Sequence, residues 1–225
     1  GGLVEVASHA ILPSVLPLHS FILTLLAMTP VLLSVWRNPQ PRAFLHAVVY
    51  CQMCSFMLGY HVHEKAILTA VVLLGLVCLE SPLDAKTYLL ASWVGHFSLF
   101  PLLFEPREEP IKLGLFLCHV ATSFYFVDGY HKLQQAKVGS VPCGVAFTVP
   151  EKLYLAGLAP LYIFTSLVHP RLARATDGSL RLPFLPLLLT SVYCALGLVH
   201  VWALTLLRWF WHPKPQAVET RTKAE

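Results

Sequence analysis

Four side chains that can bind an anion or move a proton lie within five positions of the sequence. The stretch Gly59–Leu68 reads GYHVHEKAIL and contains His61, His63, Glu64 and Lys65. A protonated histidine or a lysine ammonium can hold a phosphate through charge-assisted hydrogen bonds. A neighbouring carboxylate can orient a histidine and keep it protonated. These residue types therefore predict a site for an anionic group.

A metal site is a weaker interpretation of the same stretch. His61 and His63 would supply two ligands, but the helical HExxH spacing of a zinc enzyme is missing, and the other histidines are dispersed. Cys51 and Cys54 form a C-x-x-C pair inside an apolar segment without a second pair, so we interpret them as buried thiols. Neither a Gly-rich phosphate loop nor a Ser/His/Asp array is visible. We expect no metal and no cofactor.

The composition is that of a membrane protein. Hydrophobic residues make up 56% of the chain and charged residues 12%, against about 25% charged in soluble domains. Apolar runs of about 20 residues, the length that crosses a bilayer, recur along the sequence. The formal net charge is +4, without the basic stripe of a nucleic-acid-binding protein. We therefore predict an all-α, polytopic transmembrane helix bundle, with membrane lipid and no nucleic acid among its partners.

Apolar runs predict about seven spans between residues 1 and 211, followed by a polar tail over residues 212–225. The third span is short for a crossing, so we expect part of HVHEK to extend it. Because the sequence does not open with Met, we expect it to be a piece of a longer polypeptide. The spans are Leu12–Trp36, Ala43–Tyr60, Ala66–Leu79, Thr87–Phe104, Ile111–Tyr130, Glu151–His169 and Pro183–Trp211.

Lysines and arginines in the connections favour a cytosolic C-terminus, because cytoplasmic loops are rich in them. The connections RNPQPR, ESPLDAK (80–86) and HKLQQAKVGSVPCGVAFTVPEK and the tail would then be cytosolic, and HVHEK would face the lumenal or extracellular side. Arg171, Arg174 and Arg181 go against this rule. Arg221 and Lys223 resemble a dilysine-type retrieval signal of the endoplasmic reticulum, although a solvated tail is an equal alternative.

The cluster in HVHEK is costly if it lies at membrane depth. An ionisable residue there costs about 2.5–3.5 kcal/mol, and such residues usually mark a substrate or ion path. In a helix, His61 and Lys65 would share one face, whereas a re-entrant turn would direct the whole cluster into one cavity. A plain interfacial cap, with Glu64 and Lys65 reaching water, is the third alternative.

Three stretches resemble one enzyme family. They are GYHVHEKAIL, GHFSLFPLLF (95–104) and LPFLPLLLTSVYCALG (182–197). Together they resemble the endoplasmic reticulum glucosyltransferases that use dolichyl phosphate glucose, which are multispanning enzymes of the GT-C type. With ILPSVLPL (11–18), the chain is more similar to the members that add the second glucose, in α-1,3 linkage, than to those that add the first.

The resemblance implies an inverting transfer of glucose from dolichyl phosphate glucose to a monoglucosylated dolichyl-diphosphate oligosaccharide. Both substrates present their sugars in the lumen. In this family the catalytic base is an aspartate in a lumenal loop near the full-length N-terminus, so we expect no catalytic residue in this chain and no activity from the chain alone. The motif match places donor-phosphate binding on His63, supported by Lys65 and His61, with Glu64 orienting the cluster.

Several other polar residues are given structural interpretations. We expect none of Asp84, Asp128 and Asp177 to be the base, and we interpret His96 as a satisfied core histidine. A solvated loop is the interpretation of Arg107, Glu108 and Glu109. The enzyme that adds the first glucose, a truncated non-catalytic isoform, and a transporter or lipid-binding membrane protein remain as alternatives to the predicted function.

Overall fold

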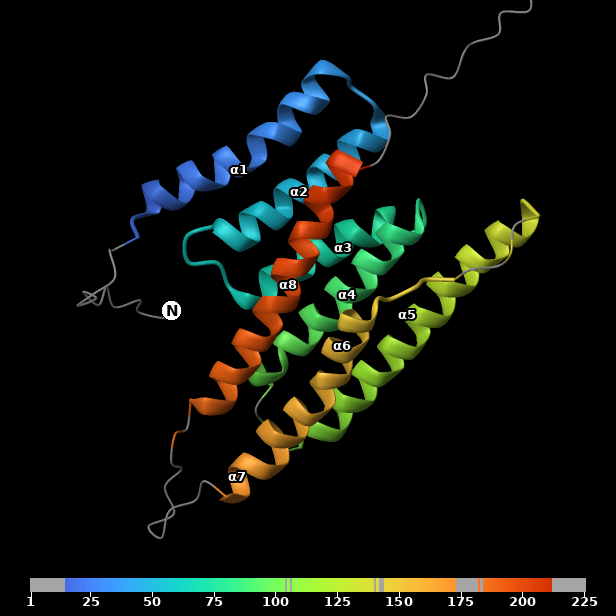
Figure 1. Cartoon of the computed structure of the whole chain (residues 1–225). Coiled ribbons are helices and arrows are strands. Elements are labelled where there is room, and N and C mark those ends of the chain that lie inside the picture. Colours follow the sequence, from blue (N-terminus) through green and yellow to red (C-terminus); the bar gives the residue numbers. More distant parts are fainter. Residues whose placement is uncertain are drawn as a thin grey trace, which may run out of the picture.

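A computed structural model describes residues 15–103, 105, 107–139, 141, 144–172, 182 and 184–211. Every regular element in this part of the chain is helical (Figure 1), which confirms the all-α prediction. The predicted polar tail, the arginines Arg174 and Arg181, and Asp177 lie outside the described residues.

Each of the seven predicted segments is helical. HVHEK extends the third segment as predicted, although by a 3-10 turn rather than by an α-helical one. The elements are α1 (Pro17–Arg37), α2 (Pro41–Leu58), the 3-10 turn η1 (Glu64–Ala66), α3 (Ile67–Val77), α4 (Pro82–Ser98), the 3-10 turn η2 (Phe100–Leu102), α5 (Glu109–Lys137), α6 (Val149–Tyr162), the π-helical segment η3 (Ile163–Val168), α7 (His169–Leu172) and α8 (Leu185–Trp211).

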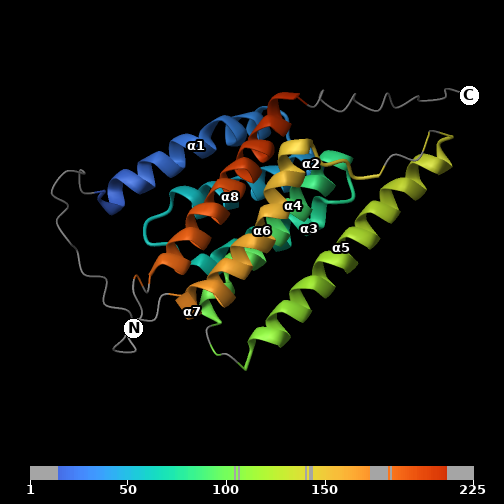
Figure 2. The same ribbon diagram turned by 60° about the horizontal axis from the view of Figure 1, so that its bottom comes forward.

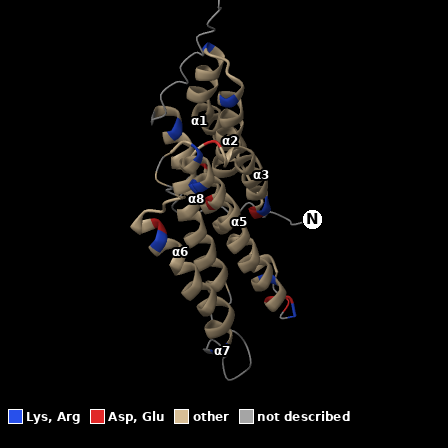
Figure 3. Cartoon of the chain, turned by 90° about the vertical axis from the view of Figure 1, so that its right-hand side faces the viewer, with Lys and Arg blue, Asp and Glu red and all other residues tan. Residues whose placement is uncertain are grey.

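Four helices of the described part are long and apolar enough to cross a membrane. They are α1, α5, the continuous helix Val149–Arg171 and α8. The helices α2, α3 and α4 do not reach that length and hydropathy together. Charged residues gather towards the ends of the helices and leave long uncharged stretches between them (Figure 3).

Local sequence signals explain where several helices begin and change pitch. Proline occupies the first turn of α1, α2, α4 and α6, where its missing N–H costs nothing. Thr148 and Glu151 form a capping box at the start of α6. Pro160 inside α6 removes a helical hydrogen bond, and the π-helical segment η3 follows it.

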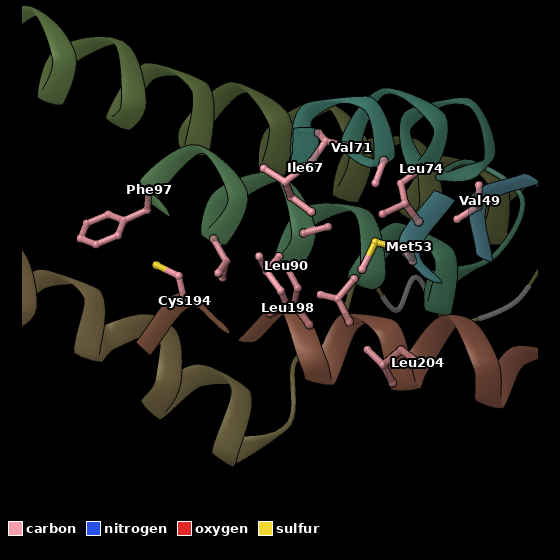
Figure 4. Packing of buried hydrophobic residues seen from close by; sticks show 14 of the residues in the cluster. Val49, Met53, Ile67, Val71, Leu74, Leu90, Phe97, Cys194, Leu198 and Leu204 are labelled. Atoms are coloured by element: carbon pink, nitrogen blue, oxygen red, sulfur yellow. The ribbon is translucent and has the colours of Figure 1, made fainter. Parts of the chain in front are cut away.

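The core lies where α3 and α4 meet α2 and α8 (Figure 4). Met53, Ile67 and Val94 have no exposed surface, and the cluster runs from Phe97 at one end to Leu204 at the other. The helices α1 and α5 lie on opposite sides of this core (Figure 2). Their outer faces carry many exposed apolar side chains, which suits contact with lipid tails.

Two tyrosines fix α6 against α8. The rings of Tyr154 and Tyr193 stack with centroids 4.7 Å apart. The hydroxyl of Tyr154 donates to the Tyr193 carbonyl oxygen at 2.8 Å, and the hydroxyl of Tyr193 donates to the Tyr154 carbonyl oxygen at 2.6 Å. A Cβ at Gly157 or Gly197 would lie 2.1 or 2.2 Å from the opposing hydroxyl oxygen. Each helix therefore needs its glycine to admit the other's tyrosine.

The helices alternate in direction, so the connections form two ends of the bundle. Ser20 of α1 donates to the Leu58 carbonyl oxygen at the end of α2, and Glu109 at the start of α5 accepts from Tyr162 at the end of α6. Both contacts lie at the end of the bundle that carries His63, which we call the His63 end. We call the opposite end the Arg208 end. The predicted grouping of the connections RNPQPR and ESPLDAK on one side agrees with this arrangement.

Four ionisable side chains form a network at the Arg208 end, and two of them, His46 and Asp84, are buried. Arg208 Nε donates to Asp84 Oδ1 at 2.6 Å, and Arg208 Nη2 lies 3.6 Å from Glu80 Oε2. His46 Nε2 lies 3.0 Å from the same Glu80 oxygen. The Asp84 side chain is only 5% exposed, so its charge depends on these partners. This ionic network ties α2, α4 and α8 together.

Replacing Arg208 with methionine is expected to destabilise the bundle strongly. Asp84 would be left buried without its cation, and breaking a buried pair in this way costs about 3–5 kcal/mol. Thermal unfolding of the detergent-solubilised chain measures the effect as a lower Tm. Lys137→Met, which removes an exposed cation at the end of α5, is the control and should shift the Tm little. Equal Tm values for the two variants would contradict the role given to the ionic network.

Candidate functional site

The predicted phosphate site forms a short loop between α2 and α3. We call Tyr60–Ala66 the His63 loop. His61 has a positive φ of 51°, and its ring lies against that of Tyr60 with centroids 3.9 Å apart. His63 caps η1, where the Ala66 N–H donates to the His63 carbonyl oxygen at 2.9 Å. The loop therefore turns the chain by 3-10 geometry rather than by a continuous helix.

All four predicted site residues are exposed in this loop. His61, His63, Glu64 and Lys65 form no side-chain hydrogen bond or ion pair within the described part of the chain. The helical alternative, with His61 and Lys65 on one face, is wrong, because residues 60–63 are not helical. The structure thus gathers the four residue types in one loop, where the described residues leave their polar atoms available to a ligand.

Both ends of the His63 loop are held by close packing. At its start, a Cβ on Gly59 would lie 2.3 Å from the Ser55 carbonyl oxygen and 2.6 Å from the Val62 side chain. At its end, Ile67 is fully buried, and its side chain would lie 3.2 Å from a Cβ on Gly95. The loop is therefore exposed in its side chains and anchored in its backbone.

The three sequence motifs meet in one core cluster. Ile67 follows the His63 loop, Phe97 lies in GHFSLFPLLF, and Cys194 lies in LPFLPLLLTSVYCALG. Figure 4 shows all three side chains in the cluster. The motifs are separated in sequence, but they pack around the region from which the His63 loop emerges.

A second polar group at the His63 end was not predicted from the sequence. The sequence predicted a solvated loop at Glu109, and this prediction is wrong. Glu109 begins α5, its Oε1 lies 2.6 Å from the Nζ of Lys112, and its Oε2 accepts from the Tyr162 hydroxyl at 2.8 Å. Lys112 is 8% exposed. Only the i, i+3 spacing of Glu109 and Lys112 signals this group in the sequence, and Tyr162 lies 53 residues away from Glu109.

The histidine within GHFSLFPLLF is satisfied, as predicted. His96 Nδ1 donates to the Ser92 carbonyl oxygen at 2.6 Å. His119 of α5, which the sequence did not single out, lies beside it with ring centroids 4.6 Å apart, and its Nε2 is 2.7 Å from Ser92 Oγ. These contacts join α4 to α5.

The described aspartates that were judged poor bases are both held by partners. Asp84 belongs to the ionic network. Asp128 accepts the Val145 N–H at 2.8 Å and lies 2.7 Å from the Nζ of Lys132. A carboxylate that already accepts such bonds is a weak candidate for removing a substrate proton.

The sequence is similar to those of known proteins. Residues 1–205 match the model of the ALG6, ALG8 glycosyltransferase family. The dolichyl pyrophosphate Glc1Man9GlcNAc2 alpha-1,3-glucosyltransferase of Bos taurus is 42% identical over 202 residues, covering 89% of this chain and 36% of that protein. The Arabidopsis thaliana protein of the same name is 39% identical over 206 residues, covering 90% of this chain and 40% of its own length. No solved structure matches the chain.

Gly59→Ala is expected to disturb the start of the His63 loop. The added methyl group must displace the backbone at Ser55 or at the loop, at a cost of about 1–3 kcal/mol. The Tm of the solubilised chain should fall accordingly. Gly129→Ala, where a Cβ meets nothing within 4 Å, should leave the Tm unchanged or raise it slightly. A Gly59→Ala protein as stable as the Gly129→Ala control would show that the loop is not anchored there.

Proposed function

Because the chain belongs to the ALG6, ALG8 glycosyltransferase family, we propose that it forms part of a membrane glucosyltransferase. The enzyme would move glucose, with inversion, from dolichyl phosphate glucose to a monoglucosylated dolichyl-diphosphate oligosaccharide. The observation that carries this proposal is the 42% identity over 202 residues to a relative named for an alpha-1,3-glucosyltransferase acting on Glc1Man9GlcNAc2. The chain spans little more than a third of the length of such relatives, 36% in that case.

The setting proposed is the endoplasmic reticulum membrane. Residues 1–211 would be the transmembrane region and residues 212–225 a cytosolic tail. The Arg208 end would face the cytosol and the His63 end the lumen. The apolar helices support the membrane setting, and the distribution of lysine and arginine supports the orientation.

The His63 loop would bind the phosphate of the donor. His63, with Lys65 and His61 beside it, offers N–H donors that have no partner among the described residues. Such donors stabilise the negative charge that develops on a departing phosphate, because they are positioned before the reaction begins. Glu64 would orient the cluster. The proton of the acceptor hydroxyl would be taken by a carboxylate outside this chain.

His63→Ala tests the donor-phosphate role. A suitable host is a chimaera in which this chain replaces the matching 202 residues of the Bos taurus relative. We expect glucose transfer from a short-chain polyprenyl phosphate glucose in membranes to fall by about 100-fold, the order seen when a donor to a developing anion is removed. Protein abundance, measured by immunoblot, should stay unchanged.

His19→Ala is the matched control, since His19 is another exposed histidine at the His63 end, in α1. It should retain at least half of the transfer rate. Loss of activity in both variants would point to general damage, and unchanged transfer in His63→Ala would remove the proposed role of His63.

Cysteine labelling tests the orientation. Val62→Cys lies in the His63 loop and Val138→Cys follows α5 at the Arg208 end, and both valines are exposed, at 38% and 81%. Each variant is made in a chain whose native cysteines have been replaced, and it is studied in sealed microsomes. A membrane-impermeant maleimide should label Val138→Cys at once. It should label Val62→Cys only after the membrane is permeabilised. The reverse pattern would invert the proposed orientation.

A further inference from the structure

A pocket lies at the His63 end of the bundle, and no residue of the His63 loop lines it. Its volume is 340 Å³, and α4, η2, α5, η3 and α8 contribute to its walls. The lining includes the Glu109–Lys112–Tyr162 group, Thr165 and Thr190. Small-molecule pockets range over about 300–1,000 Å³, so this one suits a single ring rather than an oligosaccharide.

The charges that line this pocket already neutralise each other. Lys112 Nζ donates to Glu109 Oε1 at 2.6 Å and to the Leu103 carbonyl oxygen at 3.1 Å. It also lies 5.0 Å from the ring centroid of Phe100. Glu109 and Lys112 are the only charged residues among those that line the pocket in the described part of the chain. An anionic ligand would find no free cation here and would meet the Glu109 carboxylate.

Three of the four hydroxyl groups that line the pocket already donate hydrogen bonds within the protein. Tyr162 donates to Glu109 Oε2 at 2.8 Å, Thr165 to the Leu161 carbonyl oxygen at 2.9 Å, and Thr190 to the Pro186 carbonyl oxygen at 2.9 Å. Their oxygen lone pairs, and those left on the Glu109 carboxylate, remain as acceptors. The pocket therefore favours a ligand with many O–H donors.

An aromatic wall completes the pocket. The rings of Phe97 and Phe100 stack with centroids 4.9 Å apart, and both line the pocket. The two rings give the pocket an apolar side, against which the C–H groups of a ligand can pack, while the hydroxyl and carboxylate oxygens form its polar side. A neutral pyranose fits the volume of the pocket, its balanced charges and its excess of hydrogen-bond acceptors.

We propose that this pocket binds one hexose of the acceptor, namely its terminal neutral sugar. The donor phosphate would lie on the cationic His63 loop at the same end of the bundle. Phe97 of the pocket and Ile67, which directly follows the His63 loop, belong to one core cluster, so the two sites share a rigid support. The assignment of the sugar to the acceptor rests on the proposed function, whereas the binding of a neutral hexose rests on the pocket alone.

Saturation-transfer NMR on the 225-residue chain in lipid nanodiscs tests the proposal, with methyl α-D-glucopyranoside as the probe. We expect the probe to bind, and glucose 1-phosphate to bind at least tenfold more weakly because of Glu109. Tyr162→Phe and Thr165→Val each remove a hydroxyl without removing bulk, and each should raise the Kd for methyl glucoside at least fivefold.

Matched controls come from the exposed side of α5. Tyr125→Phe and Thr122→Val are the same chemical changes at exposed positions, and both should leave the Kd unchanged. The proposal is overturned if the wild-type chain does not bind methyl glucoside, if glucose 1-phosphate binds more tightly, or if the pocket variants behave like the controls. If one of these results were found while glucose transfer still depended on His63, only the proposed hexose site would be rejected. Hexose binding without any transfer would leave the pocket standing and remove the proposed enzyme.

Discussion

The contact between Arg208 and Asp84 is the constraint on which the arrangement of the helices depends. It joins α8 to α4 across 124 positions of sequence at 2.6 Å, and it neutralises a carboxylate that is 5% exposed. A buried charge without a partner is costly. If α8 moved away from α4, the Asp84 carboxylate would be left buried without its cation. With α8 fixed, Tyr193 reaches α6, and Thr190 lines the pocket proposed to bind a hexose.

The two ends of the bundle differ in how their polar groups are satisfied. At the Arg208 end, carboxylates and cations are paired inside the ionic network, which suits a structural role. At the His63 end, the cationic side chains of the His63 loop have no partners within the described residues, and the neighbouring pocket offers acceptors to a neutral ligand. Unpaired donors beside spare acceptors are what a site for a charged phosphate and an uncharged sugar requires.

The sequence predicted the local features well and the long-range ones poorly. Apolar runs located all seven helical segments, and residue types located the loop that carries His63, because both signals lie within a few neighbouring positions. The sequence predicted that Glu80 and Asp84 lie in a polar connection and that Glu109 lies in a solvated loop. It missed their contacts because the partners come from distant helices. Arg208 lies 124 residues from Asp84 and Tyr162 lies 53 residues from Glu109, and no spacing rule connects such positions.

The profile of lipid-linked oligosaccharides tests the central claim most directly. The chimaera of this chain with the Bos taurus relative would be expressed in cells that lack the alpha-1,3-glucosyltransferase, and the oligosaccharides would be separated by chromatography. We predict that the monoglucosylated species disappears and more highly glucosylated species return. Persistence of the monoglucosylated species, with the chimaera present at normal abundance in the membrane, would contradict the proposal that this chain serves the second glucose transfer.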